Sequence, residues 1–470
     1  MTDELTRLSA TRIAGLVRAR RISPVEVVEA YLRRIERINP ALNAIVTLAP
    51  HALDRAREAE AALMRGENVG LLHGVPVTVK DTIETSGVKT TSGSMARAQH
   101  VPSQNAPAVE RILAAGAIIL GKTNVPEMAI PYECDNPVFG RTNNPHDVGR
   151  TSGGSSGGEA AAISARLSPL GLGSDLSGSI RVPAHFCGIV GLNPTTGAVS
   201  CAGHFPPADG PLALGAVVGP MARYVTDVAL LLQVLSSGGE LPSTTASRSP
   251  DAGHKRFKGW RVGRYPEEAN VPVTRETKLA VDAALRILGE AGLDIVEEAP
   301  PGLERAAALW PALFSQASMI QLREIYDGHE RDGGPVVRAF LASASHAEKE
   351  LPDALDRSLA ERAALLTGLA SWMETVPLII APVGASPAFE HGARRVNVGE
   401  QEMSVFRAFS YSRGVNVLGL PAVAVPVGRS PEGLPIGVQI IGRPFEEEAV
   451  LAAASIIEER LGGGSGLQAW

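Results

Sequence analysis

The chain has 470 residues, of which 44% are hydrophobic and 20% are charged, so it can bury a large core and is not intrinsically disordered. Its net charge is −6 and no stretch is strongly basic, which argues against a protein that binds nucleic acid. The 49 glycines follow no fixed period, which excludes a collagen-like repeat.

Cysteine and histidine positions give no sign of a metal site or a disulfide framework. The cysteines are Cys134, Cys187 and Cys201, which lie far apart without a C-x-x-C pair, and the 10 histidines show no ligand spacing. The N-terminus lacks the apolar core of a signal peptide, and the longest uncharged run, 182–208, is interrupted by glycine and proline. We therefore predict a cytoplasmic protein with no membrane span, no metal and no cofactor.

The first 120 residues predict alternating helices and strands. Ser23-Pro24-Val25-Glu26 combines a capping box with proline at the first helical position, and Asn39-Pro40 predicts the end of that helix. The further elements predicted here are a helix over 51–64, a strand over 74–81, a helix over 107–115 and a strand over 117–120. The glycine-rich segment 149–178 predicts a centre that is poor in strands.

The C-terminal part predicts more buried strands, over 381–383, 422–427 and 438–441. A helix follows, with acidic residues at 446–448 and Arg460 near its end, in the order that complements the helix dipole. Strands that alternate with helices in this way predict an α/β sheet protein.

The chain is predicted to form one domain over 1–470. Its best linker-like stretch is 242–254, and the alanine- and leucine-rich segment 303–373 predicts helices almost throughout. We interpret 242–376 as a helical, more variable insertion or cap within that domain, rather than as an independent domain.

Two segments rich in serine and glycine follow each other closely, over 151–158 and 173–181. Glycines beside serines let the backbone approach a ligand, and consecutive free amides in such a turn form an anion-binding nest. An oxyanion hole is a nest of this kind. On composition alone, a pair of flexible loops fits equally well.

Two other motif matches are rejected. Residues 116–123 satisfy the Walker A pattern, but the Ala-Ile-Ile-Leu in place of its loop is typical of a strand. Residues 153–157 contain G-x-S-x-G, but a nucleophile elbow needs an apolar strand directly before it, and 143–150 predicts an irregular loop.

Three segments, in this order, resemble the signature of the amidase signature family. They are Val79-Lys80-Asp81, Gly-Gly-Ser-Ser-Gly-Gly over 153–158, and Ser177-Gly178-Ser179-Ile180-Arg181. The likeness runs from the first helices to about Leu235 and resumes near Val415, and so long an ordered pattern is specific. It implies the family's fold, in which a mixed central β-sheet lies between α-helices.

The resemblance also implies a Ser–cis-Ser–Lys triad. Ser179 would be the nucleophile, Ser155 the bridging serine after a cis peptide bond, and Lys80 the base. Serine is a poor nucleophile until a base takes its proton, and a lysine is a base only when it is neutral. Lowering a lysine pKa from about 10.4 to about 7 corresponds to roughly 4.6 kcal/mol, and burial acts in that direction.

Around the nucleophile, the resemblance implies an oxyanion hole formed by the amides of Leu176, Ser177, Gly178 and Ser179. Many family members have glycine where this chain has Ser177, but a serine still offers its amide. Asp175 and Arg181 flank the nucleophile, and we interpret them as a brace of the loop.

Two functions fit the resemblance. The first is a stand-alone hydrolase, similar to the fatty-acid-amide-hydrolase-like branch, that converts a small, acyl or aryl carboxylic amide through a seryl acyl-enzyme into an acid and ammonia or an amine. The second is the A subunit of a tRNA-dependent glutamine amidotransferase. That family of subunits has an acidic residue seven positions before the asparagine that corresponds to Asn416, where this chain has Phe409. A phenyl ring cannot pair with an ammonium group, so the hydrolase is favoured. An inactive binding module is a more remote alternative, and the complete triad argues against it.

Apolar residues are candidates for a substrate pocket. Met128, Ile130, Phe205 and Phe409 could line it, and packing in the core would explain them equally well. The predicted partner is a small-molecule amide, with no nucleic acid and no membrane span, and a homodimer is left open.

Overall fold

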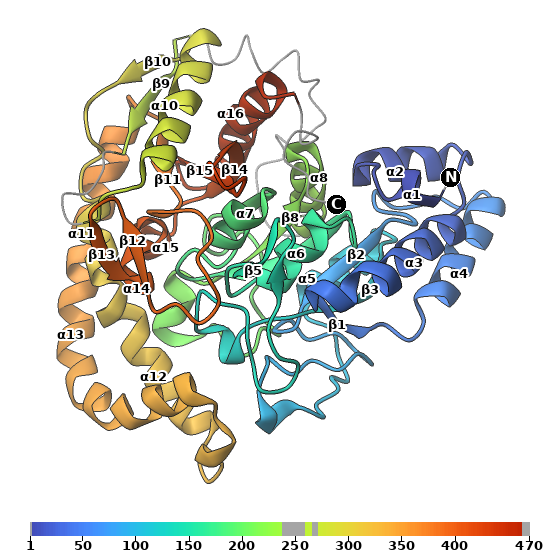
Figure 1. Ribbon diagram of the computed structural model, residues 1–470, viewed down its shortest axis with the longest axis horizontal. Coiled ribbons are helices and arrows are strands. Elements are labelled where there is room, and N and C mark those ends of the chain that lie inside the picture. The colour runs from blue at the N-terminus through green and yellow to red at the C-terminus, as the bar shows by residue number, and fades with distance from the viewer. Residues whose placement is uncertain (1, 237–258, 266–270, 463–470) are drawn as a thin grey trace.

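One mixed sheet joins segments from both halves of the chain (Figure 1). The computed structural model describes residues 2–236, 259–265 and 271–462, so the linker predicted over 242–254 lies outside the described residues. Within them, the 11 strands of this sheet follow the order β1-β3-β2-β6-β8-β7-β14-β15-β11-β9-β10. Helices pack on both faces of the sheet, which confirms the predicted α/β fold.

The strands of the sheet are β1 (Ile45–Leu48), β2 (Pro76–Lys80), β3 (Ile118–Thr123), β6 (Leu170–Asp175), β7 (Val190–Asn193), β8 (Val217–Ala222), β9 (Arg261–Arg264), β10 (Asp294–Val296), β11 (Leu378–Pro382), β14 (Ala422–Arg429) and β15 (Pro435–Gly442). Two separate pairs are β4 (Asn143–Asn144) with β5 (Asp147–Thr151), and β12 (Arg395–Val398) with β13 (Gln401–Ser404).

The described α-helices are α1 (Thr2–Leu5), α2 (Ala10–Arg18), α3 (Pro24–Leu42), α4 (Ala52–Met64), α5 (Pro107–Ala114), α6 (Gly157–Ser164), α7 (Arg181–Cys187), α8 (Val225–Ser236), α10 (Arg275–Glu290), α11 (Leu303–Trp310), α12 (Gln316–Ile325), α13 (Pro335–Met373), α14 (Val405–Ala408), α15 (Arg413–Leu418) and α16 (Glu447–Arg460). In the described part of the chain, none of these helices has the length and apolar character needed to span a membrane.

The sheet separates two hydrophobic cores, because successive side chains of a strand point to opposite faces. In β14, Val423, Val425 and Val427 belong to one core, whereas Ala422 and Ala424 belong to the other. Helices α8, α10 and α16 contribute to the first core, and α7, α11 and α15 contribute to the second.

The predicted capping box of α3 is formed. The Ser23 side chain caps the first turn, and the Glu26 carboxylate accepts the Ser23 N–H at 3.0 Å. The helix does not end at Asn39-Pro40, however, but continues to Leu42. Pro40 lies in the last turn, where its missing N–H removes only one hydrogen bond, and the left-handed Asn43 then closes the helix.

The segment 149–178 contains a central strand, so the prediction of a strand-poor centre is wrong. Strand β6 pairs in parallel with β2 and antiparallel with β8. Its glycines reflect close packing rather than a loop, since a Cβ at Gly171 would lie 1.8 Å from a carboxylate oxygen of Glu159 on α6. Because β2 and β6 are parallel neighbours, Lys80 and Asp175 at their carboxyl ends lie at the same edge of the sheet.

Residues 303–373 are mostly helical, as predicted, and form α11, α12 and α13 with short connections. The wider region 242–376 is not wholly helical, because it also contributes β9 and β10 to the sheet. Strand β9 belongs there because Val262 is buried and pairs with Leu378 of β11. The single-domain organisation and the greater variability of this region stay predictions.

Candidate active site

The three predicted triad residues lie near the carboxyl ends of β2 and β6. Lys80 is the last residue of β2, Ser155 precedes α6, and Ser179 precedes α7. Both serines line one cavity with a volume of about 1020 Å³. Ser155 is 1% exposed and Ser179 is 9% exposed, so the cavity is their route to a substrate.

Lys80 is fully buried and hydrogen-bonded. Its Nζ lies 2.7 Å from Ser155 Oγ, 2.8 Å from Ser174 Oγ and 3.3 Å from the Ser174 carbonyl oxygen. Burial lowers the pKa of Lys80 from 10.5 to about 7, because the ammonium loses its hydration, and the negative charge of Asp175 opposes this shift only in part. A lysine with such a pKa can accept a proton near neutral pH.

The two serine loops are tied to each other and to β6. The Gly154–Ser155 peptide bond is cis. The Ser156 N–H donates to the Ser179 carbonyl oxygen at 3.0 Å, and the Ser156 hydroxyl donates to the Ser174 carbonyl oxygen at 3.2 Å. These bonds fix where the loop before α6 meets the loop before α7.

Asp175 and Arg181 form a buried ion pair below the nucleophile loop. Arg181 Nη2 lies 3.0 Å from Asp175 Oδ1, and both side chains are fully buried. The guanidinium also donates to Gln439 at 2.8 Å and to the Ser412 carbonyl oxygen at 3.0 Å. Burial raises the pKa of Asp175, but the charge and hydrogen bond of Arg181, with the N–H groups of Ile180 and Gly178, outweigh it and hold that pKa below its usual value. These contacts fit the predicted role of the pair, which is to hold the nucleophile loop in place, and that role stays our interpretation.

The predicted oxyanion hole needs one correction. The Gly178 N–H donates to Asp175 Oδ1 at 2.7 Å, so this amide is already used by the brace and does not face a substrate. The amides of Leu176, Ser177 and Ser179 have no hydrogen-bond partner within the described residues. They remain the candidate donors.

Two aromatic side chains bind carbonyl oxygens of the nucleophile loop. Trp310 Nε1 donates to the Leu176 carbonyl oxygen at 2.8 Å, and the Tyr132 hydroxyl donates to the Ser177 carbonyl oxygen at 2.6 Å. In a trans peptide the C=O and the following N–H point in opposite directions. Holding the Leu176 carbonyl on Trp310 therefore turns the Ser177 N–H the other way.

Comparison with known proteins decides the family. A family model described as Amidase matches residues 26–451. The chain belongs to the amidase family. A solved structure described as an amidase superimposes with a TM-score of 0.86 at 28% identity, covering 97% of this chain and 100% of that one.

The chain is also similar in sequence to a subunit of a larger enzyme. The A subunit of glutamyl-tRNA(Gln) amidotransferase from Thermoanaerobacter pseudethanolicus is 33% identical over 483 residues, covering 97% of each chain. The solved structure of the Thermotoga maritima protein of that name has a TM-score of 0.76 at 26% identity, covering 97% of this chain and 95% of that one.

These relatives contradict the predicted partners. Their name describes one component of an enzyme that acts on a charged tRNA, so the expectation of a small-molecule amide as the partner, with no nucleic acid, is wrong. The error has a physical reason. The net charge of one chain does not reveal surfaces that other subunits supply to a shared substrate.

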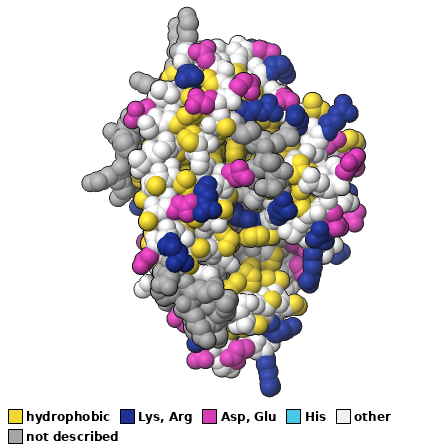
Figure 2. Space-filling view, turned by 90° about the vertical axis from the view of Figure 1, so that its left-hand side faces the viewer, with side chains coloured by type: hydrophobic (Ala, Val, Ile, Leu, Met, Phe, Trp, Pro, Cys, Tyr) yellow, Lys and Arg dark blue, Asp and Glu magenta, His cyan; other side chains and the backbone are white. Residues whose placement is uncertain are grey.

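The cavity of this amidase-family chain has largely apolar walls. Outside the motif segments, the walls come from the segment 127–137, from the loop between β7 and β8, and from α12 and α13. The apolar side chains include Met128, Ile130, Met319, Leu322, Val336 and Phe340. On the side of the molecule where α11 and α13 lie, hydrophobic side chains gather in a hollow of the surface (Figure 2). Val336 and Phe406 both line the cavity and are 40% and 46% exposed, so they lie towards its mouth.

Two of the four predicted pocket residues line this cavity, and two do not. Met128 and Ile130 are part of its wall. Phe409 is instead fully buried among aromatic rings, with its centroid 5.2 Å from that of Phe186. Phe205 packs beside the cavity lining, with the Arg97 guanidinium 3.7 Å above its ring. Phe409 thus packs in the core, whereas Phe205 is only partly buried, against a cluster that includes Met128.

Sequence reasoning missed several residues that touch the site. Ser174 lies in the second serine-glycine segment but no motif distinguishes it. His204 Nε2 lies 2.9 Å from Ser174 Oγ, and it comes from the loop between β7 and β8. Trp310 belongs to the helical region. Since these residues come from distant segments, no local pattern could have placed them beside Lys80.

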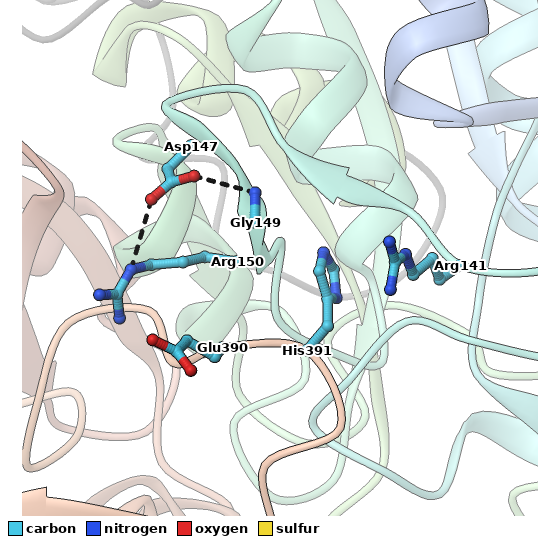
Figure 3. A pocket seen from close by; sticks show the side chains of 6 residues that line it. All are labelled: Arg141, Asp147, Gly149, Arg150, Glu390 and His391. Atoms are coloured by element: carbon cyan, nitrogen blue, oxygen red, sulfur yellow. Dashed lines mark hydrogen bonds and ion pairs between the residues drawn. The ribbon is translucent and has the colours of Figure 1, made fainter.

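A second, smaller pocket lies apart from the predicted triad (Figure 3). Its volume is about 370 Å³, and it is lined by Arg141, Asp147, Gly149, Arg150, Glu390 and His391. Asp147 accepts the Gly149 N–H at 2.9 Å and pairs with Arg150 at 3.5 Å. Its charges thus partly neutralise one another, and no nucleophile lines it. No group of His, Cys, Asp and Glu side chains able to hold a metal ion occurs among the described residues.

Proposed function

We propose that this chain hydrolyses a carboxylic amide through an acyl-enzyme on Ser179, with Ser155 as the relay and Lys80 as the base. The observation that carries the proposal is the 2.7 Å contact between Ser155 Oγ and the Nζ of a fully buried lysine whose pKa is about 7. Burial keeps this lysine neutral, and the contact gives its lone pair a hydroxyl to deprotonate.

The proposed reaction has two halves. Ser179 Oγ attacks the amide carbonyl carbon while its proton passes to Ser155, whose own proton passes to Lys80. The amides of Leu176, Ser177 and Ser179 then stabilise the negative oxygen. When the carbon–nitrogen bond breaks, the same path returns the proton to the leaving nitrogen, which departs as ammonia or an amine. Water then attacks the ester of Ser179, and the acid and the free hydroxyl are released.

For the physiological role, we propose that the chain is the A subunit of a tRNA-dependent glutamine amidotransferase and that glutamine is the amide it hydrolyses. The support is the likeness to relatives of that name, which extends over 97% of both chains at 33% identity. In this setting ammonia released at Ser179 would be used by partner subunits on a charged tRNA. The cytoplasmic location that such a role needs stays a prediction.

One observation favours a second candidate function, the hydrolysis of an amide with an apolar acyl or aryl group. The position where the amidotransferase component is expected to carry an acid is occupied by Phe409, which is fully buried and cannot bind the glutamine ammonium. The cavity walls from α12 and α13 are apolar at Met319, Leu322 and Phe340. Such walls favour an apolar acyl chain or ring over a zwitterion.

We also propose that residues 1–470 act as one domain whose helical part completes the cavity. Glu127 beside the cavity accepts the Tyr326 hydroxyl at 2.9 Å and the Gly334 N–H at 2.8 Å. Tyr326 ends α12 and Gly334 precedes α13, so one buried carboxylate ties both helices to the cavity wall.

The test uses the purified full chain and a matched Ser179→Ala variant. A fluorophosphonate probe should form an adduct on Ser179, located by mass spectrometry, and the variant should not react. Ammonia release is then compared between glutamine and aliphatic and aryl amides, with and without amidotransferase partner subunits and charged tRNA. Release from glutamine that needs the partners supports the amidotransferase role, and release from apolar amides by the chain alone supports the second candidate. If no adduct forms on Ser179 and no ammonia is released under any condition, the chain is not an amidase, and the inactive binding module is the remaining alternative.

A further inference from the structure

His204 and Ser174 extend the hydrogen-bond chain beyond Lys80, and both line the same cavity as the two reacting serines. Ser174 Oγ lies between two nitrogens, 2.8 Å from Lys80 Nζ and 2.9 Å from His204 Nε2. The other ring nitrogen, His204 Nδ1, lies 2.8 Å from the Pro206 carbonyl oxygen. The His204 loop is itself tied to the segment after Lys80, since the Phe205 N–H donates to the Thr82 carbonyl oxygen at 2.7 Å.

The chemistry of these partners fixes where each proton lies. A carbonyl oxygen can only accept, so His204 Nδ1 carries a hydrogen. Burial, together with the charge of Lys80, lowers the pKa of His204 to about 4, so at neutral pH the ring is neutral and Nε2 is an acceptor. The Ser174 hydroxyl therefore donates to Nε2, and its oxygen is left to accept from Lys80.

The remaining question is how a neutral Lys80 distributes its two N–H groups and one lone pair. Ser174 Oγ must accept one N–H, because its own hydrogen is committed to His204. The Ser174 carbonyl oxygen, 3.3 Å from Nζ, can only accept the other. The lone pair is then left for the third neighbour, Ser155 Oγ at 2.7 Å, which is the direction a base needs.

We propose that His204 is a positioning residue that acts through Ser174 to point the lone pair of Lys80 at Ser155. The inference rests on the proposed function, because it concerns the same proton path. It adds a residue whose hydrogen bond goes to Ser174 rather than to a triad residue and that lies outside the three signature segments.

Loss of the acceptor at His204 has a defined consequence. The Ser174 hydroxyl could then turn its hydrogen towards Lys80 and donate to the lone pair. It would compete with Ser155 for the base, which slows proton removal from the relay. It would also stabilise the neutral amine, which lowers the pKa of Lys80 further. The other ionisable groups that act on Lys80, namely Asp175, Glu159 and Cys134, would be unchanged.

The test compares His204→Leu, which removes the acceptor, with His204→Gln, whose amide oxygen can reach the place of Nε2. Pseudo-first-order labelling of Ser179 by a fluorophosphonate probe is measured from pH 5 to pH 10 in the full chain, so no knowledge of the natural amide is needed. His204→Leu should lower the plateau rate by about tenfold, as expected for one misdirected hydrogen bond, and move the rise to lower pH. His204→Gln should restore most of the rate.

A double-mutant cycle with Ser174→Ala separates positioning from a general loss of structure. If His204 acts only through Ser174, adding His204→Leu to Ser174→Ala should change the rate by less than about twofold. Thermal unfolding of each variant controls for folding. A His204→Leu protein with the rate and pH profile of the parent, or a full extra loss in the double variant, would overturn the inference. Failure of the parent chain itself to label at Ser179 would instead count against the proposed function.

Discussion

Raising the pH should activate this chain through loss of one proton from Lys80. Burial lowers the pKa of that lysine from 10.5 to about 7. At pH 8, a lysine with the higher pKa would be neutral in about 0.3% of molecules, whereas one with the lower pKa is neutral in about 90%. Burial thus increases the population of active base by roughly 300-fold at that pH.

The assay is the pH dependence of kcat/KM, or of Ser179 labelling where no substrate is in hand. The rate should rise about tenfold per pH unit below 7 and reach a plateau above it. His185 and His204 cannot produce this rise, because burial lowers the pKa of each to about 4. Lys80→Arg should not restore the rate at any working pH, since a guanidinium stays protonated. Lys80→Ala should recover some activity at high pH, where hydroxide replaces the base.

Two results would refute this reasoning. A rise centred near pH 10 would mean that Lys80 keeps its ordinary pKa and is not the buried base described above. Near-normal rates in Lys80→Arg would mean that position 80 needs only a positive charge, and the triad assignment would then be wrong.

Four further outcomes are expected. The free energy of unfolding should rise with pH between about 7 and 10.5, because in this range Lys80 binds a proton in the unfolded chain but not in the folded one. Urea titrations over this pH range should show the rise in the parent protein and a smaller rise in Lys80→Met. Ser179→Ala should abolish turnover without loss of folding, whereas Ser155→Ala should cost less, and the two losses should not multiply in the double variant. Arg181→Met should destabilise the protein by about 3–5 kcal/mol in urea unfolding, because it leaves a carboxylate buried and unpaired. Phe340→Ala should raise KM for apolar amides and leave that for glutamine nearly unchanged, and equal effects on both would argue against an apolar acyl wall.

Local patterns predicted those parts of the structure that local physics determines. Ser23 and Glu26 form their capping box, and the strand that ends at Lys80 lies where its valines predict it. Glycine misled the interpretation of 149–178, because glycine signals a turn and close packing alike. Gly171 belongs to a central strand and leaves room for the Glu159 carboxylate.

The sequence predicted the candidate site only where the reacting residues lie in short, recognisable segments. Lys80, Ser155 and Ser179 stand in recognisable segments, and Met128 lies in the predicted wall. Phe409 shows the limit, because an apolar residue near a site packs in the core or lines the pocket according to neighbours that sequence does not reveal. His204 and Trp310 show the same limit for polar contacts, since each reaches the site from a distant segment.

The bond from Trp310 to the Leu176 carbonyl links substrate choice to catalysis. Trp310 is the last residue of α11, and the helices that follow it, α12 and α13, form part of the cavity wall. A chimera that exchanges these helices with those of a relative would therefore alter two properties together, the fit of the acyl group and the aim of the oxyanion donors. Engineering of substrate range in this scaffold should keep the indole at 310 and vary the wall beyond it, at positions such as Met319 and Phe340.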